Sequence, residues 1–216
     1  MLIVGVTGSI GMGKSTVANV LKKHGAAVWN ADNIVHQILG PDGSAVDHIA
    51  EYFGKKILVG TLGKNRVNRD LLGQIVFNNP EELKVLESII HPLIRFEERK
   101  FLMISKFNGY SISVLDIPLL FETHGDSRCD ATIVATAPKF VQKARVLSRP
   151  GMTKDKLDGI LSRQIGDDEK IRRADFVVRT GLDKAVSYRA LGLIIKKLRT
   201  WPCKNWPSSW SPNITS

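Results

Sequence analysis

An eight-residue glycine-rich segment near the start of the chain narrows the possible folds more than any other part of the sequence. Residues 8–15 read GSIGMGKS and fit the pattern G-x-x-x-x-G-K-[ST]. That pattern needs a strand before it and a helix after it. Residues 2–6 are a short apolar run typical of a buried strand, and residues 14–23 have the pattern of a helix. The sequence therefore predicts a strand–loop–helix unit that binds phosphate, and this context argues against a chance glycine-rich turn.

Each part of the segment has a task in binding a nucleotide. Glycines permit backbone conformations that turn successive N–H groups inward around a β-phosphate, and the helix adds its positive end. Lys14 is expected to bridge the β- and γ-phosphates of ATP, and Ser15 to bind Mg²⁺ through its hydroxyl. The ATP-binding residues predicted in this part of the chain are Gly8, Gly11, Met12, Gly13, Lys14, Ser15 and Thr16.

Short apolar runs alternate with helical stretches farther along the chain. Residues 26–29, 111–115 and 131–135 are predicted strands, and a helical run covers residues 33–39. This alternation predicts an α/β fold of three layers, in which helices cover a parallel sheet of the P-loop type.

Three further segments complete the predicted organisation of the chain. Residues 36–108 are largely helical in pattern and indicate an inserted substrate-binding subdomain, within a kinase core that spans residues 1–200. Residues 140–174 are expected to form a helical lid. Residues 201–216 carry three tryptophans among Pro, Ser and Asn and predict a partly ordered tail that lays aromatic side chains on the surface.

Two carboxylates follow predicted strands, where open α/β sheets bind their ligands. Asp32 precedes the helical run at residues 33–39 and could accept a proton from a hydroxyl group, or it could cap the helix N-terminus. Its position alone leaves both interpretations open. Asp116 follows the strand at residues 111–115, as does the acidic residue that holds Mg²⁺ or its waters in P-loop enzymes. The alternative is a solvated strand end.

Positive charge is concentrated in one part of the chain. The formal net charge is +10, and residues 139–200 hold 16 Lys or Arg against 7 Asp or Glu. Such a segment could bind nucleic acid or a membrane surface, or it could be an arginine-rich lid over nucleotide phosphates. Aromatic side chains that would stack on bases are isolated here, at Phe140, Phe176 and Tyr188. The lid is therefore favoured, and no nucleic-acid partner is expected.

The chain also predicts its cellular setting. No stretch approaches the apolar length needed to cross a bilayer, and the first residues lack the basic lead-in of a signal peptide. Cys129 and Cys203 match neither a zinc site nor a redox pair, so both are expected to be free thiols in a reducing compartment. We expect a cytoplasmic protein with no membrane partner, either a monomer or a weak homo-oligomer.

The order of these motifs resembles that of bacterial dephospho-coenzyme A kinases. The resemblance spans residues 1 to about 200 and includes Asp32, the DIPLLFE run at residues 116–122, and Arg163-Gln164. It implies phosphorylation of the ribose 3′-hydroxyl of dephospho-coenzyme A, with ATP as donor and Mg²⁺ as cofactor, giving coenzyme A and ADP. A nucleoside monophosphate kinase and a nucleic-acid-binding ATPase are the alternatives.

The resemblance also implies roles for single residues. Asp32 would be the general base, catalytic together with Lys14 and Arg145, and Asp116 would support Mg²⁺, contact the substrate or replace Asp32 as the base. Arg145 and Arg163 of the lid would bind ATP phosphates and stabilise the transferring group.

In the inserted block, Arg69 and His91 match family positions and would bind the substrate. A surface ion pair is the rival interpretation for Arg69. For His91 the rival is a structural histidine that caps a turn. The neighbouring Val76 and Phe77 are expected in the core.

The sequence departs from the family pattern in two places. Asn30 stands where the family often has the first acid of Asp-Ala-Asp, which removes a second carboxylate there but leaves Asp32 intact. Arg179-Thr180-Gly181 stands where the family often has Asp or Asn before a glycine-containing turn. The contacts to adenine implied for that turn are therefore not carried over.

Overall fold

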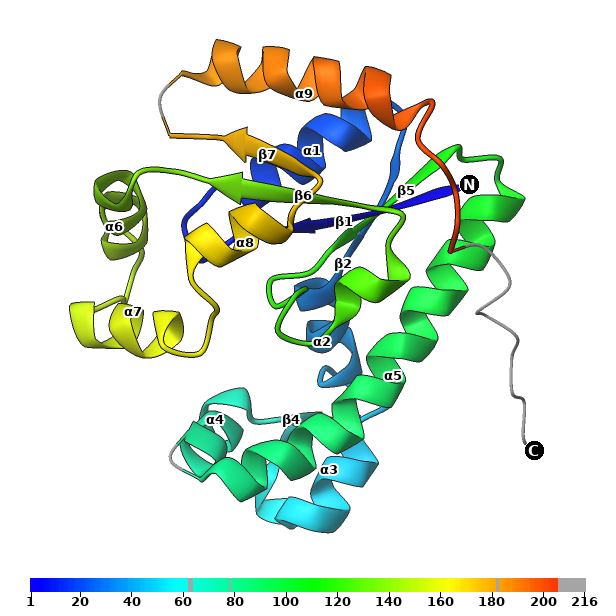
Figure 1. Cartoon of the computed structure of the whole chain (residues 1–216). Helices are drawn as coiled ribbons and strands as arrows, with labels where there is room; N and C mark the ends of the chain where they lie inside the picture. The colour runs from blue at the N-terminus through cyan, green and yellow to red at the C-terminus, as the bar shows by residue number, and fades with distance from the viewer. Residues whose placement is uncertain (62–63, 78, 182, 206–216) are drawn as a thin grey trace. The chain divides into compact units, whose positions relative to one another are not determined.

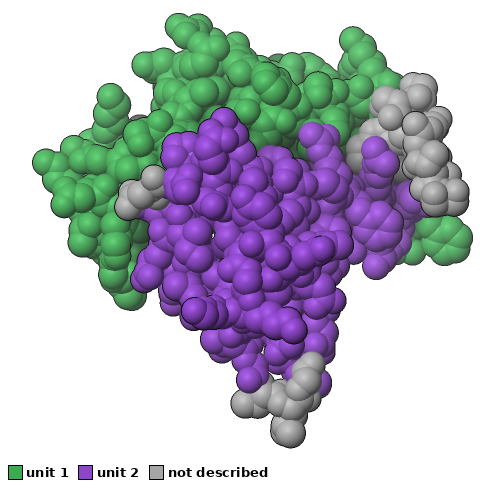
Figure 2. Space-filling view, turned by 90° about the horizontal axis from the view of Figure 1, so that it is seen from below, with its two compact units in different colours: residues 1–29, 105–216 green, residues 30–104 purple. Residues whose placement is uncertain are grey.

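The computed structural model describes residues 1–61, 64–77, 79–181 and 183–205. The chain divides into two compact units, coloured separately in Figure 2. Unit 1 comprises Met1–Trp29 and Ser105–Ser216, and unit 2 comprises Asn30–Ile104. The insertion predicted for residues 36–108 overlaps unit 2.

A five-stranded sheet forms the centre of the chain's larger part (Figure 1). β1 pairs in parallel with β5 on one side and β6 on the other, and β6 pairs in parallel with β7. Every residue of β1, β5 and β6 is buried, which explains why these strands read as continuous apolar runs. The strand order is β2 (Ala27–Asn30), β5 (Ile112–Asp116), β1 (Leu2–Thr7), β6 (Ala131–Thr136) and β7 (Phe176–Arg179).

Helices cover the sheet and confirm the predicted α/β class. α1 (Lys14–Lys23) and α9 (Lys184–Leu198) join the strands in one buried apolar cluster. In α1 this cluster takes Val17, Val20 and Leu21, whose spacing of three and four residues places them on one face of a helix. Figure 1 shows α8 (Asp167–Arg173) on the side of β6 away from α9. The remaining elements of this unit are η2 (Gly125–Arg128), α6 (Lys139–Leu147) and α7 (Lys154–Leu161).

Unit 2 has an apolar core of its own, which includes Ile38, Ile49, Val67, Leu72 and Ile90. It contains an antiparallel hairpin that was not predicted from the sequence, because residues 36–108 are largely helical in pattern. Its elements are α2 (Ala31–Ile38), α3 (Val46–Phe53), η1 (Lys55–Ile57), β3 (Leu58–Thr61), β4 (Lys64–Val67), α4 (Arg69–Phe77) and α5 (Pro80–Phe107), which continues into unit 1 from Ser105.

One predicted core residue of unit 2 is exposed. Val76 is 8% exposed and belongs to the core, whereas Phe77 is 59% exposed, so its predicted burial is wrong. Both lie in α4, where consecutive side chains point in directions about 100° apart. Val76 shares the buried face with Leu72, four residues before it, and Phe77 points away from that face.

The described part of the C-terminal tail is held against the sheet. The Trp201 ring packs on Phe176 with 5.0 Å between centroids, and its Nε1 donates to the carbonyl oxygen of Asp130 at 2.9 Å. The backbone N–H groups of Lys204 and Asn205 donate to the Asp130 carboxylate at 2.6 and 2.8 Å. Residues 206–216, with the tail's other tryptophans, lie outside the described residues.

Two simpler expectations can also be compared with the structure. Cys129, which is buried, and Cys203, which is exposed, are free thiols, as predicted. Among the helices of the described residues, none combines the length and the apolar character required to span a membrane.

Candidate active site

The glycine-rich segment lies between β1 and α1, as the sequence predicts. Its turn is closed by the Met12 N–H, which donates to the Ser9 carbonyl at 3.0 Å, and α1 begins directly after Gly13. The first N–H groups of a helix have no intrahelical acceptor, and Gly13 has no side chain to satisfy them. The loop therefore offers backbone donors at a helix N-terminus, which suits a phosphate anion. Met12 is 3% exposed, and its Sδ accepts the Ala137 N–H at 3.1 Å, so its side chain packs inside unit 1.

Replacement of Gly13 by Ala is expected to weaken ATP binding by about tenfold or more, a loss of at least 1.4 kcal/mol. Gly13 has φ +86°, and a Cβ there would lie 2.5 Å from Thr180 Oγ1 and 2.9 Å from Thr180 Cβ. The loop would have to shift. Titration of ATP into the purified variant measures the effect.

Gly25→Ala is the matched control for this variant. Gly25 has φ +88°, and an added Cβ would meet no atom of the described residues within 4 Å. In both variants an alanine must adopt a left-handed backbone conformation, which costs about 1–2 kcal/mol in stability. Only Gly13→Ala also crowds the loop. Equal ATP affinities in the two variants would contradict the steric argument.

Lys14 and Asp116 meet beside the loop. Lys14 Nζ lies 2.6 Å from Asp116 Oδ1, and the two side chains are 13% and 3% exposed. Asp116 is the last residue of β5 and is in register with Val6 of β1, which brings its carboxylate to the strand that leads into the loop. The sequence predicted both residues separately, and the fold joins them.

The residues present fit the requirements of a Mg²⁺ ion. Mg²⁺ prefers oxygen ligands and commonly takes one or two from the protein, with phosphates and waters as the others. Ser15 and Asp116 supply oxygen donors of this kind in unit 1. No cluster of three or more His, Cys, Asp or Glu that could hold a metal occurs among the described residues, so the nucleotide and water would have to complete the shell.

Arg145, predicted to contact ATP, is engaged with the outside of the loop. Its Nη1 donates to the Gly11 carbonyl at 3.3 Å and to Thr180 Oγ1 at 3.2 Å, and its Nη2 donates to the Thr180 carbonyl at 2.8 Å. Arg145 is thus fixed beside the phosphate loop from α6. Arg163, the other predicted lid arginine, is exposed in the segment that follows α7.

Two glutamines, one near each end of the predicted lid, bind the backbone of Ile10 in the loop. The Gln142 side chain, 5% exposed, donates to the Ile10 carbonyl at 2.8 Å, and the Ile10 N–H donates to Gln164 Oε1 at 3.4 Å. Gln142 lies in α6 and Gln164 follows α7. Sequence reasoning gave neither glutamine a role, although Gln164 stands in the Arg163-Gln164 pair that carries part of the family resemblance.

A buried ion pair secures the segment after Arg163. Lys170 is fully buried, and its Nζ lies 3.1 Å from Glu122 Oε1, which also accepts the Ile165 N–H at 3.0 Å. Glu122 ends the run at residues 116–122. This carboxylate therefore ties the return segment of the lid to the loop that follows β5.

Two other arginines of the basic segment are paired at the surface. Arg172 contacts Glu169, and its hydrogen bond and charge hold the pKa of that carboxyl below its usual value. Arg173 Nη2 lies 2.9 Å from Asp126 Oδ2. Arg172 therefore lies on the solvated face of α8, whereas the guanidinium of Arg173 also lies 4.5 Å from the centroid of the buried Phe121 ring.

In unit 2, Asp32 lies in the first turn of α2 and is exposed. The helix cap is Asn30, whose side chain accepts the Asn33 N–H at 2.9 Å. The interpretation of Asp32 as the N-cap is therefore wrong. The amide that replaces the family's first acid supplies the capping oxygen, and the Asp32 carboxylate is left available for another task.

His36 connects two residues that the sequence predicted separately. His36 Nδ1 lies 2.9 Å from the Asp32 carbonyl oxygen, and Arg69 Nη1 contacts His36 Nε2. This geometry assigns the proton to Nδ1, which donates to the carbonyl, while Nε2 accepts from Arg69. The contact replaces the ion pair considered for Arg69. Sequence reasoning missed His36, although its four-residue spacing from Asp32 places both on one helix face.

His91 is exposed in the middle of α5, directly before Pro92. The interpretation of His91 as a cap for a turn is wrong, because the helix continues on both sides of it. Pro92 lacks a backbone N–H, so the helix loses one hydrogen bond there and still persists.

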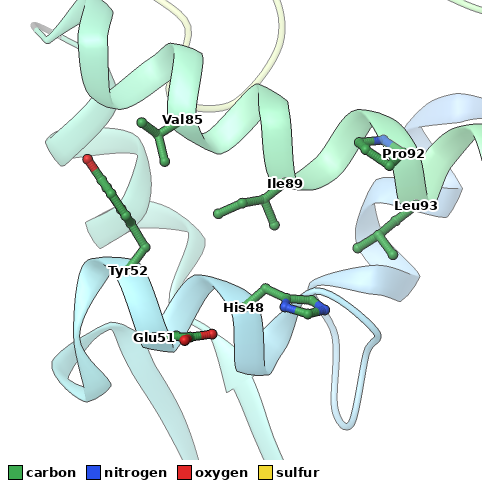
Figure 3. A pocket seen from close by; sticks show the side chains of 7 residues that line it. All are labelled: His48, Glu51, Tyr52, Val85, Ile89, Pro92 and Leu93. Atoms are coloured by element: carbon green, nitrogen blue, oxygen red, sulfur yellow. The ribbon is translucent and has the colours of Figure 1, made fainter.

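Unit 2 also contains a hollow of about 520 Å³ between α3 and α5 (Figure 3). Its wall is mainly apolar, with an imidazole, a carboxylate and a phenol at its α3 side. Neither Arg69 nor His91 is among the residues that form it. Those residues are His48, Glu51, Tyr52, Val85, Ile89, Pro92 and Leu93.

The structure combines three features: a parallel sheet with β1 at its centre, a glycine-rich loop at the N-terminus of α1, and a lysine–aspartate pair beside that loop. Together these features define a P-loop phosphotransferase. The family model for dephospho-CoA kinase matches residues 2–183. The chain belongs to the dephospho-CoA kinase family.

Individual relatives agree with this assignment. The chain is 46% identical over 185 residues to the dephospho-CoA kinase of Rhodopseudomonas palustris strain HaA2, covering 85% of this chain and 89% of that relative. A crystal structure of a Thermus thermophilus protein matches with a TM-score of 0.73 at 30% identity, over 91% of this chain and 97% of that one. The dephospho-CoA kinase of Campylobacter jejuni matches with a TM-score of 0.65 at 29% identity, over 92% and 97%.

Proposed function

We propose that this chain transfers the γ-phosphoryl group of ATP to the 3′-hydroxyl of the ribose of dephospho-coenzyme A, using the residues described above. The chain is a kinase of the family that completes coenzyme A synthesis with ATP. The observation that supports this chemistry most directly is the 2.6 Å contact between Lys14 and Asp116. The contact supports the proposal because a cation that would bind phosphate and a carboxylate that would bind Mg²⁺ meet at one edge of the loop.

The donor side of the reaction is assigned to unit 1. The backbone of residues 8–15 would cradle the β-phosphate, Lys14 would bridge the β- and γ-phosphates, and Thr16 would lie by the α-phosphate. Arg145 and Arg163 would add positive charge near the transferring group. Bound Mg²⁺, held through Ser15 and Asp116, would neutralise negative charge on the phosphate oxygens.

The acceptor side is assigned to unit 2. Asp32 would accept the proton of the ribose hydroxyl as its oxygen attacks the γ-phosphorus, which is a positioning task as much as a chemical one. The Asp32 carboxylate is exposed on the first turn of α2, as such a task requires. Arg69, oriented by His36, and His91 would contact the acceptor.

The setting of the enzyme is also part of this proposal. A kinase of a biosynthetic family acts on small molecules, and we expect it in the cytoplasm as a monomer or weak homo-oligomer. The predicted domain limits belong here too, with a kinase core over residues 1–200, a substrate subdomain at about 36–108 and a lid at about 140–174.

Release of ADP tests the proposal directly. Purified protein with ATP and Mg²⁺ is supplied with dephospho-coenzyme A, AMP, CMP, UMP or no acceptor. We expect ADP only with dephospho-coenzyme A, and mass analysis should find a product phosphorylated at the 3′ position. If the protein phosphorylates a nucleoside monophosphate instead, dephospho-coenzyme A is not its acceptor. Equal ADP release without any acceptor would indicate an ATPase.

A further inference from the structure

Thr180 touches the phosphate loop from a distant part of the sequence. It follows β7, and its N–H donates to the Thr136 carbonyl at 2.8 Å, which extends the pairing of β7 with β6. Its hydroxyl donates to the Met12 carbonyl at 2.7 Å, across 168 positions of the chain. Thr180, the residue that directly follows β7, is thereby joined to the loop.

The same hydroxyl also receives a hydrogen bond. Its single proton is used on Met12, and its oxygen accepts from Arg145 Nη1 at 3.2 Å, while the Thr180 carbonyl accepts from Arg145 Nη2 at 2.8 Å. Thr180 thus joins the phosphate loop and α6 to the end of β7. The approach is close, because a Cβ on Gly13 would lie 2.5 Å from Thr180 Oγ1.

The bond to Met12 controls a donor of the loop. In a trans peptide the carbonyl of one residue points opposite to the N–H of the next. A Met12 carbonyl held toward Thr180 therefore turns the Gly13 N–H away from Thr180. That N–H comes just before the first helical residue of α1, where backbone donors are directed at a phosphate.

We propose that Thr180 is a positioning residue for ATP, whose hydroxyl holds the Met12–Gly13 peptide and Arg145 in their binding arrangement. The inference rests on the proposed use of residues 8–15 for ATP phosphates. It concerns nucleotide binding alone and gives Thr180 no contact with the acceptor.

Thr180→Val tests the inference, because valine keeps the shape and removes the hydroxyl. We expect the Kd for MgATP, measured by calorimetric titration, to rise about tenfold through the loss of two hydrogen bonds at the hydroxyl. The KM for dephospho-coenzyme A should stay within about twofold of the parent value. Thr180→Ser restores the hydroxyl and is expected to restore the Kd for MgATP to within about twofold.

The outcomes separate positioning from a merely structural role. An unchanged Kd in Thr180→Val, or an equally weakened Thr180→Ser, would overturn the inference, even if the thermal midpoint of unfolding fell. If Thr180→Val does not fold, Thr180→Ala removes the same hydroxyl without added bulk and carries the same expectation. A parent protein that binds MgATP but does not phosphorylate dephospho-coenzyme A would refute the proposed acceptor, and the Kd comparison would still decide the role of Thr180.

Discussion

Asp32→Asn is expected to lower kcat for phosphorylation of dephospho-coenzyme A by about 10²- to 10⁴-fold, the usual contribution of a general base. The amide keeps the size of the side chain but cannot accept the ribose hydroxyl proton. The Kd for MgATP should stay close to the parent value, because the ATP-binding residues proposed here lie in unit 1. Steady-state kinetics with both substrates and a separate ATP titration measure the two quantities.

Asp47→Asn is the matched control. Asp47 is an exposed carboxylate in the first turn of α3, another eight-residue helix of unit 2. Both variants remove one negative charge from a helix N-terminus, at a cost of about 0.3–1 kcal/mol in stability. Only the Asp32 variant should lose turnover. A near-normal kcat in Asp32→Asn would show that Asp32 is not the general base, and Asp116 would then be the candidate for that role.

Lys170→Ala is expected to lower the free energy of unfolding by about 3–5 kcal/mol, because it leaves the Glu122 carboxylate without its buried cation. Lys170 is fully buried, and the Glu122 side chain is 12% exposed. Glu122 also holds the Ile165 N–H, so the return segment of the lid should loosen with it. Urea denaturation followed by circular dichroism gives the change in free energy.

Two further variants test whether the expected loss of stability in Lys170→Ala comes from the burial of the ion pair. Arg172→Ala breaks the exposed pair with Glu169 in the same helix and should leave the urea midpoint nearly unchanged. The double variant Lys170→Met with Glu122→Gln leaves no uncompensated charge and should lose less stability than Lys170→Ala alone. A double variant that is less stable than the single one would contradict this account.

Local patterns in the sequence were sufficient for the framework of the nucleotide site. Three consecutive segments predict this framework: the apolar run at residues 2–6, the glycine-rich segment, and the helical pattern at residues 14–23. Each can be recognised from the sequence because strand and helix periodicities are short-range properties. The helix bounds agree with α1, and the predicted strands agree with β1, β2, β5 and β6 to within a residue at each end. β7 and the β3–β4 hairpin were missed, although β2, which also has four residues, was predicted. In β4 only one residue of the four is buried, so the sequence shows no apolar run there.

Contacts between distant residues were decided by tertiary structure alone. The sequence identified Lys14 and Asp116 one at a time, but only the register of β5 beside β1 brings them together. Arg69 and His36 are 33 positions apart, and Thr180 and Met12 are 168 positions apart. No periodicity within a segment specifies a partner at such separations.

Local patterns in the sequence thus identify the chemical groups and the strands, loops and helices that carry them. The packing of whole elements establishes which of those groups meet, and it leaves Val76 in the core and Phe77 exposed. The choice of Asn30 rather than Asp32 as the cap of α2 is local, because Asn30 accepts the N–H of Asn33 three residues later. The physical reason is that backbone conformation and amphipathic spacing are fixed over a few residues, whereas side-chain pairing depends on how whole elements pack.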